Sequence, residues 1–343
     1  MRAMVIEEIG PVHQEREPLT PREVPDPDPK PNELLLEVLA CGVCHTELDE
    51  IEGRTPPPDL PVIPGHEVIG RVIGWGEEVD AFEQGDRVGV AWIFWADGDC
   101  EFCRRGEENL CTSFMATGRD ADGGYAEKMT VPAPFAYPIP ETFSDVEAAP
   151  LLCAGAVGYR SLRLTDLKNG QNLGLTGFGA SGHLVLQMAK HTFPQSNIYV
   201  FARNPDERKF ARELGAVWTG PTEAEAPEPL HAIIDTTPAW KPVVEALNNL
   251  IPGGRLVINA IRKEAGDKEE LLNLNYSTHM WMEREIKSVA NVTRADVEAC
   301  LSLAAEIPLK PEVQTFELDE ANRALRELRA GGIRGAKVLR INT

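Results

Sequence analysis

Three glycines in the middle of the chain constrain its fold more than any other feature. Residues 173–183 read LGLTGFGASGH, which contains the pattern G-x-G-x-x-G at Gly177, Gly179 and Gly182. A strand-like run precedes the pattern, and a helix-like run from 182 to 191 follows it. In this context Gly177 permits a tight turn, Gly179 lets the backbone approach a pyrophosphate, and Gly182 lets the helix pack on the strand. The motif therefore predicts a dinucleotide site at the amino end of a helix.

The chain changes texture near residues 150 and 295. Its first part consists of short strand-like runs bounded by Pro or Gly, which predicts a mostly-β unit. A helix is expected over 146–163, and strands then alternate with helices, which predicts a doubly wound parallel sheet. The expected strands of this sheet are 172–175, 198–201, 232–234, 255–259 and 286–290. After residue 295 a helix, a strand, a helix and a terminal strand follow, so the fold class is α/β with a second, mostly-β unit.

The end of the second expected strand indicates which dinucleotide is bound. An enzyme that selects NAD places Asp or Glu there to bind the ribose 2′-hydroxyl, but this chain has Ala202. Arg203 follows, with Asn204 and Arg208 nearby, and an arginine can pair with a 2′-phosphate through two hydrogen bonds. We therefore expect NADP(H) to be preferred, with NAD(H) possible. The alternative is that Arg203 is a solvated surface charge and that both cofactors bind.

Seven cysteines are distributed unevenly, and three of them lie close together. Cys100, Cys103 and Cys111 form a compact set, and Asp97 precedes Cys100 by three residues, where C-x-x-C spacing puts a fourth ligand. Three thiolates and a carboxylate can hold a structural zinc ion. The alternatives are another acid as the fourth ligand, Asp99 or Glu101, or a loop without metal that carries reduced thiols.

A second set of metal-binding residue types is dispersed along the chain. It comprises Cys44, His66 and Cys153. Two cysteines and one histidine are the protein ligands of one class of catalytic zinc site, in which the fourth position stays open to water or substrate. Spacing alone does not select Cys153, because a single cysteine or histidine in an apolar context is more often part of a core.

The charge balance narrows the possible partners. There are 34 Lys and Arg against 54 Asp and Glu, a net charge of −20, which argues against nucleic acid or an anionic membrane as a partner. No apolar run reaches the roughly 18 residues that a membrane span needs. The N-terminal segment 1–8 is too short and too acidic to be a signal peptide. The expected location is therefore cytoplasmic.

Seven motifs in a fixed order relate the chain to a known family. They are CGVCHTEL from Cys41, PGHEVIG from Pro64, GDRVGV from Gly85, the loop of three cysteines, DGGYAE from Asp122, PLLCAG from Pro150 and TGFGASGH from Thr176. With these motifs the chain resembles the zinc-dependent medium-chain alcohol dehydrogenases over nearly its full length. The resemblance implies a GroES-like catalytic domain over 1–154 and 296–343 and a Rossmann domain over 155–295.

The resemblance also implies roles for individual residues. Cys44, His66 and Cys153 correspond to the ligands of the catalytic zinc, and Glu67 to a carboxylate that approaches the metal during ligand exchange. Asp97, Cys100, Cys103 and Cys111 correspond to the ligands of a structural zinc, which makes two zinc ions per chain.

Five further positions are expected around the catalytic zinc. Thr46 corresponds to the hydroxyl that binds the substrate oxygen and starts a proton relay, and His45 to a group that contacts the cofactor pyrophosphate. Glu47 stands where the family has an Asp that orients the zinc-bound histidine. Asp49 stands at the relay position usually held by His, and Arg54 where many relatives have a pocket Trp.

The function that the resemblance implies is a zinc-dependent oxidoreductase. It would transfer a hydride between NADP(H) and a primary or secondary alcohol, aldehyde or ketone, in a homodimer or homotetramer assembled through edge strands of the Rossmann sheet. A polyol dehydrogenase, a zinc-free enoyl or quinone reductase, and a non-catalytic NADPH-binding protein are the alternatives. Cys153 disfavours the first, and the joint presence of Cys44, His66 and Cys153 disfavours the other two.

Overall fold

The computed structural model describes residues 1–307, 309–331 and 334–342. The chain forms two compact units, of which unit 1 comprises Met1–Ala156 and Val292–Thr343 and unit 2 comprises Val157–Asn291. In the described part of the chain, no helix has both the length and the apolar character that crossing a bilayer requires. Each unit is built around its own sheet.

Unit 2 contains a six-stranded sheet in which every neighbouring pair is parallel. The strand order is β12-β11-β10-β13-β14-β15. β10 comes first in the sequence, and its two neighbours are β11 on one side and β13 on the other. This is the strand order of dinucleotide-binding domains, with the switch point beyond the carboxyl ends of β10 and β13. The prediction of a doubly wound parallel sheet is confirmed. The strands are β10 (Leu173–Thr176), β11 (Ile198–Phe201), β12 (Trp218–Gly220), β13 (Leu230–Asp235), β14 (Leu250–Ile258) and β15 (Glu285–Ser288).

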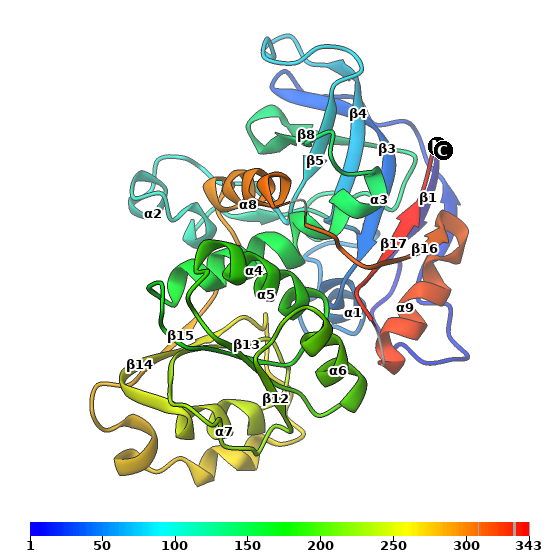
Figure 1. Cartoon of the computed structure of the whole chain (residues 1–343). Coiled ribbons are helices and arrows are strands. Elements are labelled where there is room, and N and C mark those ends of the chain that lie inside the picture. The colour runs from blue at the N-terminus through cyan, green and yellow to red at the C-terminus, as the bar shows by residue number, and fades with distance from the viewer. Residues whose placement is uncertain (308, 332–333, 343) are drawn as a thin grey trace. The chain divides into compact units, whose positions relative to one another are not determined.

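Helices cover both faces of this sheet, with α5 on one side and α7 on the other (Figure 1). Strands β10 and β11 are buried along their whole length, as expected for parallel strands with both faces covered. Side chains of β11, β13, β14 and α7 share one apolar core. The helical elements of unit 2 are α4 (Ala154–Leu164, in unit 2 from Val157), α5 (Ala180–Thr192), α6 (Pro205–Glu213), α7 (Lys241–Asn248), η4 (Lys268–Asn273) and the π-helical turn η5 (Tyr276–Met280).

Unit 1 is mostly β, as expected, and its main sheet has seven strands. The path β16-β17-β3-β4-β5-β9 is antiparallel except for the pair β16 and β17, and β8 also pairs with β3. Because β17 pairs with β3 in a register that sets Leu339 opposite Cys41, the end of the chain completes this sheet. The strands are β3 (Glu33–Val43), β4 (Val68–Trp75), β5 (Arg87–Val90), β8 (Lys128–Pro132), β9 (Ala136–Pro138), β16 (Val313–Glu317) and β17 (Ala336–Arg340).

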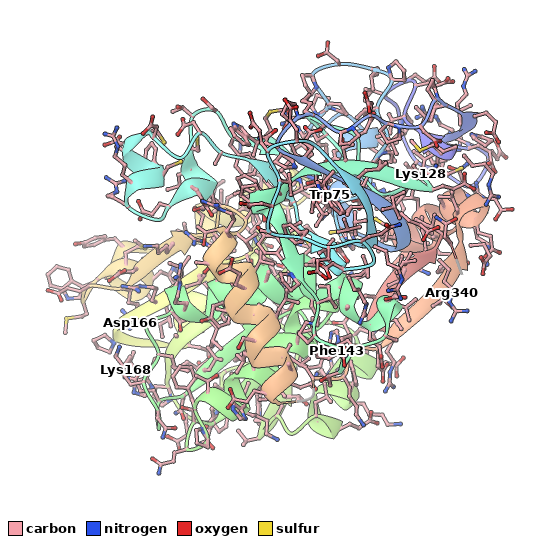
Figure 2. The ribbon with its side chains drawn as sticks, turned by 90° about the horizontal axis from the view of Figure 1, so that it is seen from above. Trp75, Lys128, Phe143, Asp166, Lys168 and Arg340 are labelled. Carbon is pink, nitrogen blue, oxygen red and sulfur yellow. The ribbon has the colours of Figure 1, made fainter. Side chains whose placement is uncertain are left out.

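Smaller elements surround the main sheet of unit 1. Two short hairpin-like pairs are β1 (Arg2–Val5) with β2 (Thr20–Glu23) and β6 (Ile93–Trp95) with β7 (Met115–Ala116). Trp75, the last residue of β4, is partly exposed where the strand ends (Figure 2). The helical elements are α1 (His45–Ile51), α2 (Glu101–Arg104), η1 (Glu108–Leu110), η2 (Ala133–Phe135), α3 (Asp145–Ala148), η3 (Ala149–Leu152), α8 (Arg294–Glu306), η6 (Leu318–Glu320) and α9 (Ala321–Ala330).

The single helix expected over 146–163 is wrong. The structure has α3, then the 3-10 turn η3, and then α4, with Cys153 between the last two. Cys153 has φ −124° and ψ −77°, outside the helical region. Apolar spacing does not reveal such a break, although Pro150 in η3 has no amide to donate and so favours one.

Candidate functional site

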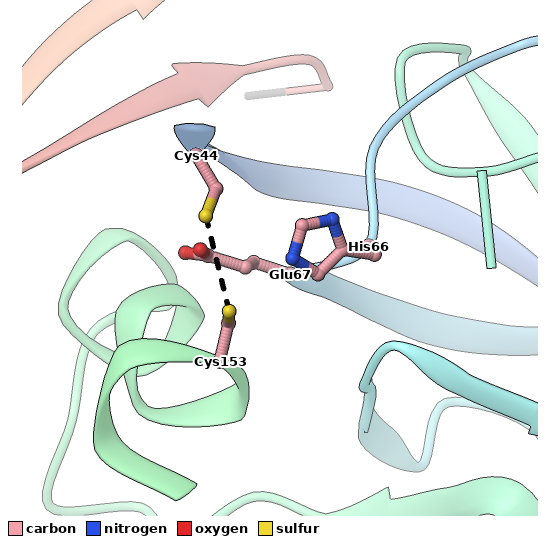
Figure 3. Close-up of side chains that lie close together, drawn as sticks. All are labelled: Cys44, His66, Glu67 and Cys153. Atoms are coloured by element: carbon pink, nitrogen blue, oxygen red, sulfur yellow. Dashed lines mark hydrogen bonds between the residues drawn. The ribbon is translucent and has the colours of Figure 1, made fainter. Parts of the chain in front are cut away.

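The cluster called here the buried cluster comprises the buried His66 and Glu67 and the half-buried Cys44 and Cys153, all in unit 1 (Figure 3). Cys44 lies at the turn where β3 ends and α1 begins, and it is the N-cap residue of that helix. Its backbone amide donates to Glu47 Oε2 at 2.8 Å, which fixes the first turn. The thiol is thus held by a sheet on one side and a capped helix on the other.

His66 and Glu67 occupy the two positions before β4 and are both buried. Gly65, which precedes them, has φ +103°, a conformation that side chains disfavour. A Cβ at this position would lie 2.4 Å from the Tyr125 ring and 2.8 Å from Cys41 Sγ. Glycine is therefore required here for the chain to pass between these side chains and bring His66 into the interior.

The fold brings the four side chains of the buried cluster together. One potential ligand atom from each lies within 4.8 Å of all the others, and the Sγ atoms of Cys44 and Cys153 are 3.9 Å apart. Cys153 reaches this point from the break between η3 and α4 (Figure 3). The predicted set of Cys44, His66, Glu67 and Cys153 is thus one spatial group.

The ionisation of the buried cluster is strongly perturbed. The contact with Cys153 lowers the pKa of the Cys44 thiol well below its ordinary value, and the same contact raises the pKa of the Cys153 thiol. Burial raises the pKa of the Glu67 carboxyl, and the nearby Cys44 adds to this effect. Closely packed groups that compete for negative charge are a common property of sites that bind a cation.

A divalent metal ion fits the donors of the buried cluster. His66 Nδ1 lies 2.5 Å from Glu47 Oε1, a contact that orients the ring. Both ring nitrogens of His66 are fully buried, and neither makes a hydrogen bond to another described residue. Because Nδ1 faces Glu47, Nε2 is the ring nitrogen left to act as a donor together with the two thiols. Imidazole and thiolate ligands bind zinc in preference to magnesium or calcium.

The remaining predicted residues of α1 differ in their surroundings. Thr46 is buried, and its Oγ1 lies 3.6 Å from Cys44 Sγ in hydrogen-bonding contact, whereas His45 is exposed at the start of the helix. Asp49 is also buried, and its Oδ1 accepts a hydrogen bond from Arg54 Nε at 2.7 Å. Asp49 and Arg54, which both depart from the family pattern, thus form one ion pair.

Sequence reasoning missed another acidic residue of α1. Glu50 is 1% exposed, and neither of its carboxylate oxygens has a hydrogen-bond partner in the described part of the chain. Burial raises the pKa of this carboxyl well above its ordinary value, and the carboxylate of Glu47 adds to the effect. No sequence signal distinguishes it, because a run of acids on a short helix is typical of a solvated face.

The loop cluster comprises Asp97, Cys100, Cys103 and Cys111, whose ligand atoms also lie within 4.8 Å of one another. Asp97 Oδ1 accepts hydrogen bonds from the amides of Asp99 at 2.8 Å and Cys100 at 2.9 Å. The bonds from the amides of Cys100 and Asp99 lower the pKa of the Asp97 carboxyl, and that from Cys100 has the larger effect on the pKa.

Two of the sulfurs in the loop cluster accept hydrogen bonds from nearby backbone amides. Cys100 is the N-cap of α2, and its Sγ accepts from the Cys103 amide at 3.5 Å. Cys111 Sγ accepts from the amides of Asp97 at 3.4 Å and Ser113 at 3.3 Å. Three thiols and one carboxylate that lie this close together fit a tetrahedral zinc ion.

The glycine motif in unit 2 has the predicted geometry. Gly177 follows β10 with φ +78°, and a Cβ on it would lie 2.8 Å from Thr236 Oγ1. A Cβ on Gly182 would lie 2.9 Å from the carbonyl oxygen of Gly177, so this glycine allows close packing of α5 on the turn. A Cβ on Gly179 would meet open space, which leaves the backbone accessible to a ligand such as a pyrophosphate.

The three polar residues after β11 that are predicted to bind the cofactor make different contacts. The Asn204 side chain caps α6 by accepting from the Asp206 amide at 2.9 Å. Arg208 NH1 donates to the carbonyls of Ala202 at 2.6 Å and Arg203 at 2.9 Å, which holds the end of the strand. Only Arg203 is exposed with a guanidinium that makes no hydrogen bond or ion pair to other described residues.

Comparisons with known proteins agree with this architecture. Residues 30–141 match the family model of the alcohol dehydrogenase GroES-like domain. The probable alcohol dehydrogenase AdhA of Mycobacterium tuberculosis is 46% identical over 92% of this chain and 90% of its own length. An alcohol dehydrogenase of Geobacillus stearothermophilus is 33% identical over 99% of both chains.

Solved structures of alcohol dehydrogenases are also similar to this chain over nearly its whole length. The cinnamyl alcohol dehydrogenase of Sorghum bicolor superimposes with a TM-score of 0.82 at 26% identity, over 99% of this chain and 97% of that one. The thermostable alcohol dehydrogenase of Pyrobaculum aerophilum superimposes with a TM-score of 0.86 at 25% identity, over 99% of each chain. Taken with the 46% identity over most of its length, these similarities mean that the chain belongs to the medium-chain alcohol dehydrogenases.

Proposed function

We propose that this protein is a zinc-dependent alcohol dehydrogenase that transfers a hydride between NADP(H) and an alcohol, aldehyde or ketone. The observation that carries the proposal is the buried cluster, in which two thiols and the unpartnered His66 Nε2 converge. The relatives named as alcohol dehydrogenases support the reaction type. A protein that only bound the nucleotide would have no chemical use for such a set of donors.

The residues of the buried cluster divide the work. Cys44, His66 and Cys153 would hold the metal, and Glu47 would keep the imidazole in place through its contact with Nδ1. When bound, zinc supplies Lewis acidity toward the substrate oxygen and the nicotinamide supplies the hydride acceptor or donor. Glu67, buried beside the ligands, is proposed to approach the metal when substrate and water exchange.

Thr46 and Asp49 are proposed to handle the proton. The Thr46 hydroxyl lies in the same turn as Cys44 and would bind the substrate oxygen and pass its proton on. Asp49, at the usual relay position, is bound to Arg54, and a paired carboxylate is a weak base near neutral pH. The proposed relay therefore ends in an ion-paired carboxylate, at the position where the family usually has histidine.

The other parts of the proposal concern stability and the cofactor. The loop cluster is proposed to hold a structural zinc, and His45 at the start of α1 to contact the cofactor pyrophosphate. Gly177, Gly179 and Gly182 are proposed to cradle the phosphates, and the preference for NADP(H) is proposed to depend on Arg203.

A homodimer or homotetramer is proposed as the assembly. Strand β15 ends the sheet of unit 2, and all four of its residues are exposed. Twofold antiparallel pairing of two copies centred on Ile286 would set Glu285 of each copy opposite Lys287 of the other, so the charges would be complementary. The exposed Trp281 and Met282 would add apolar contact next to this edge.

Two measurements on the purified protein test the proposed function. Elemental analysis should find two zinc ions per chain, one for each cluster. Steady-state kinetics with NADPH and NADH across a panel of aldehydes and ketones should show turnover with NADPH preferred. Active protein without zinc would overturn the metal assignment, and equal efficiency with the two cofactors would overturn the role of Arg203.

A further inference from the structure

A buried ion pair lies in unit 2 at the carboxyl ends of the two central strands, β10 and β13. Asp235, the last residue of β13, is fully buried, and its Oδ2 contacts the ammonium group of Lys263, whose side chain is 7% exposed. Oδ1 of the same carboxylate accepts hydrogen bonds from the hydroxyls of Thr176, the last residue of β10, at 2.5 Å and Thr237 at 2.8 Å. The pair therefore lies at the edge of the sheet where dinucleotides bind.

Lys263 joins two loops at this edge. It belongs to the β14 loop, residues 259–264, and it reaches the β13 loop, residues 236–239. Its ammonium group donates to the carbonyl oxygens of Thr237 at 2.7 Å and Ala239 at 3.0 Å. Together with the buried carboxylate, these two acceptors use all three N–H groups of the ammonium. The lysine is thus a link between loops and has no N–H left to bind a ligand.

Two backbone hydrogen bonds follow the same path between the loops. The Asn259 amide donates to the Asp235 carbonyl at 2.8 Å, and the Glu264 amide donates to the Pro238 carbonyl at 2.7 Å. Neither loop forms a regular helix or strand. Their conformation therefore depends on these few bonds and on the ammonium group that lies between them.

The β13 loop also borders the glycine turn. A Cβ placed on Gly177 would lie 2.8 Å from Thr236 Oγ1 and 2.9 Å from Thr237 Cγ2. The amide and the hydroxyl of Thr236 both donate to the Thr176 carbonyl at 3.0 Å. The two threonines therefore form a wall against the first glycine of the motif, and Lys263 holds the backbone of one of them.

The two loops belong to the second half of the sheet. Strands β10, β11 and β12 form one mononucleotide-binding half, and β13, β14 and β15 form the other. The glycine turn and the residues after β11 are expected to hold the phosphates and the adenosine. The loops that follow β13 and β14 are therefore expected to face the nicotinamide mononucleotide.

We propose that Lys263 is a positioning residue that holds the β13 and β14 loops in place for the nicotinamide half of the cofactor. The inference rests on the proposed function only in assuming that a nicotinamide dinucleotide binds at the glycine turn. Without the ammonium group, the β13 loop loses two hydrogen bonds to its carbonyls and has to become ordered when the cofactor binds. That ordering costs affinity for the nicotinamide half, whereas the adenosine half keeps its contacts.

A buried ion pair also has an ordinary explanation, because it can contribute to the stability of the sheet alone. A general loss of stability would not distinguish between the two halves of the cofactor. K168M is the matched control, since it removes the lysine of another Asp–Lys pair of unit 2, in which Lys168 contacts Asp166 at 2.5 Å. This pair precedes β10 and so lies at the opposite end of that strand.

The test uses the full-length purified protein without an alcohol substrate. Isothermal titration compares the affinity for NADPH with that for 2′,5′-ADP, a fragment that lacks the nicotinamide, and compares NADH with 5′-AMP in the same way. In K263M the affinity for the whole cofactor should fall about tenfold relative to that for its fragment. In K168M this ratio should change by less than about twofold.

A second variant separates the link between the loops from the charge of the carboxylate. K263M leaves Asp235 buried without its cation, which by itself destabilises the protein. D235N/K263M removes both charges, and the asparagine oxygen can still accept the hydroxyls of Thr176 and Thr237. The double variant also lacks the ammonium bonds to the β13 loop, so its ratio should fall about as far as in K263M, and it provides the test if K263M does not fold. Hydrogen exchange of the amides in the β14 loop should be faster in both variants.

The outcomes distinguish this inference from the proposed function. An unchanged ratio in D235N/K263M, or an equal loss for whole cofactor and fragment, overturns the role of Lys263 but leaves the dehydrogenase proposal intact. Unmodified protein that binds neither NADPH nor NADH overturns both. A lowered ratio in these variants of a protein that oxidises no alcohol supports the inference and refutes the proposed function.

Discussion

The buried cluster and the loop cluster use similar ligands but are built in different ways. The loop cluster takes its residues from 15 consecutive positions, 97–111, and three of its four members are partly exposed. The buried cluster takes its residues from the end of β3, the start of β4 and the break before α4, which are far apart in the sequence. A short loop can be stabilised by its own metal, whereas the buried cluster needs the whole sheet of unit 1 to exist first.

The electrostatics differ in the same way. In the loop cluster, hydrogen bonds from backbone amides lower the pKa of Asp97 and of Cys100, while burial raises the pKa of Cys103 to about 12. In the buried cluster, burial and neighbouring charges raise the pKa of Glu67 and of Cys153. Ligands whose negative charge is stabilised by nearby amides suit a permanent structural ion. Ligands whose negative charge is buried without enough hydrogen bonds suit an ion that must interact with a substrate.

The largest expected effect is on catalysis through the buried cluster. C153S should lower kcat/KM for alcohol oxidation by roughly a thousandfold or more and remove one equivalent of metal, because the thiolate ligand is lost. C300S, which changes another buried cysteine of unit 1 outside both clusters, should have little effect on either quantity. Metal analysis and steady-state kinetics measure both variants, and near-normal activity of C153S would contradict the assignment.

The next effect should appear in stability through the loop cluster. C111S should lower the free energy of unfolding by more than about 3 kcal/mol, because a structural zinc contributes folding energy directly. Denaturant titration with and without added zinc measures this loss. Activity per folded molecule should fall far less than in C153S, and the comparison fails if the two variants show the same pattern.

A smaller effect should follow from loss of the charge behind His66. E47Q should lower metal affinity or activity about 10–100-fold, since the glutamine holds the imidazole less firmly. E33Q is a matched control, because buried Glu33 also accepts a backbone amide three residues earlier, that of Lys30 at 3.1 Å. Cobalt substitution followed by absorption spectroscopy reads the metal site directly, and equal spectra for E47Q and the unmodified protein would contradict a positioning role.

The smallest expected effect concerns the unusual ligand of the loop cluster. D97N should weaken zinc binding at this cluster by about tenfold and D97C should strengthen it, because thiolate is the softer ligand. Competition with a chromophoric chelator gives both affinities. D99N, which changes the adjacent exposed acid, serves as the control, and a zinc affinity in D97N equal to that in D99N would remove Asp97 from the ligand set.

Much of the fold could be predicted because its signals are local. The glycine motif after an apolar run predicted the turn between β10 and α5, and the alternation of strands and helices predicted the parallel sheet. The break at Cys153 was missed, because apolar spacing continues through it while the backbone does not. The apolar periodicity of a sequence does not distinguish a continuous helix from one that is interrupted by a residue on the same face.

The candidate site was predictable only in part for a related reason. The loop cluster follows from spacing, but Cys153 could be joined to Cys44 and His66 only through the resemblance to a family. The burial of Glu50 carries no sequence signal, because a run of acids on a short helix is typical of a solvated face.

By itself, the sequence determined the local chemistry of this protein: a glycine turn for phosphates, a loop of thiols with one carboxylate, and the absence of an acid at Ala202. Only the tertiary structure decided which distant groups meet. It brought His66 and Glu67 to Cys44 and Cys153, and it bound Asp49 to Arg54. The physical reason is that local patterns report the preferences of neighbouring residues, whereas such contacts depend on strand pairing and packing across many intervening residues.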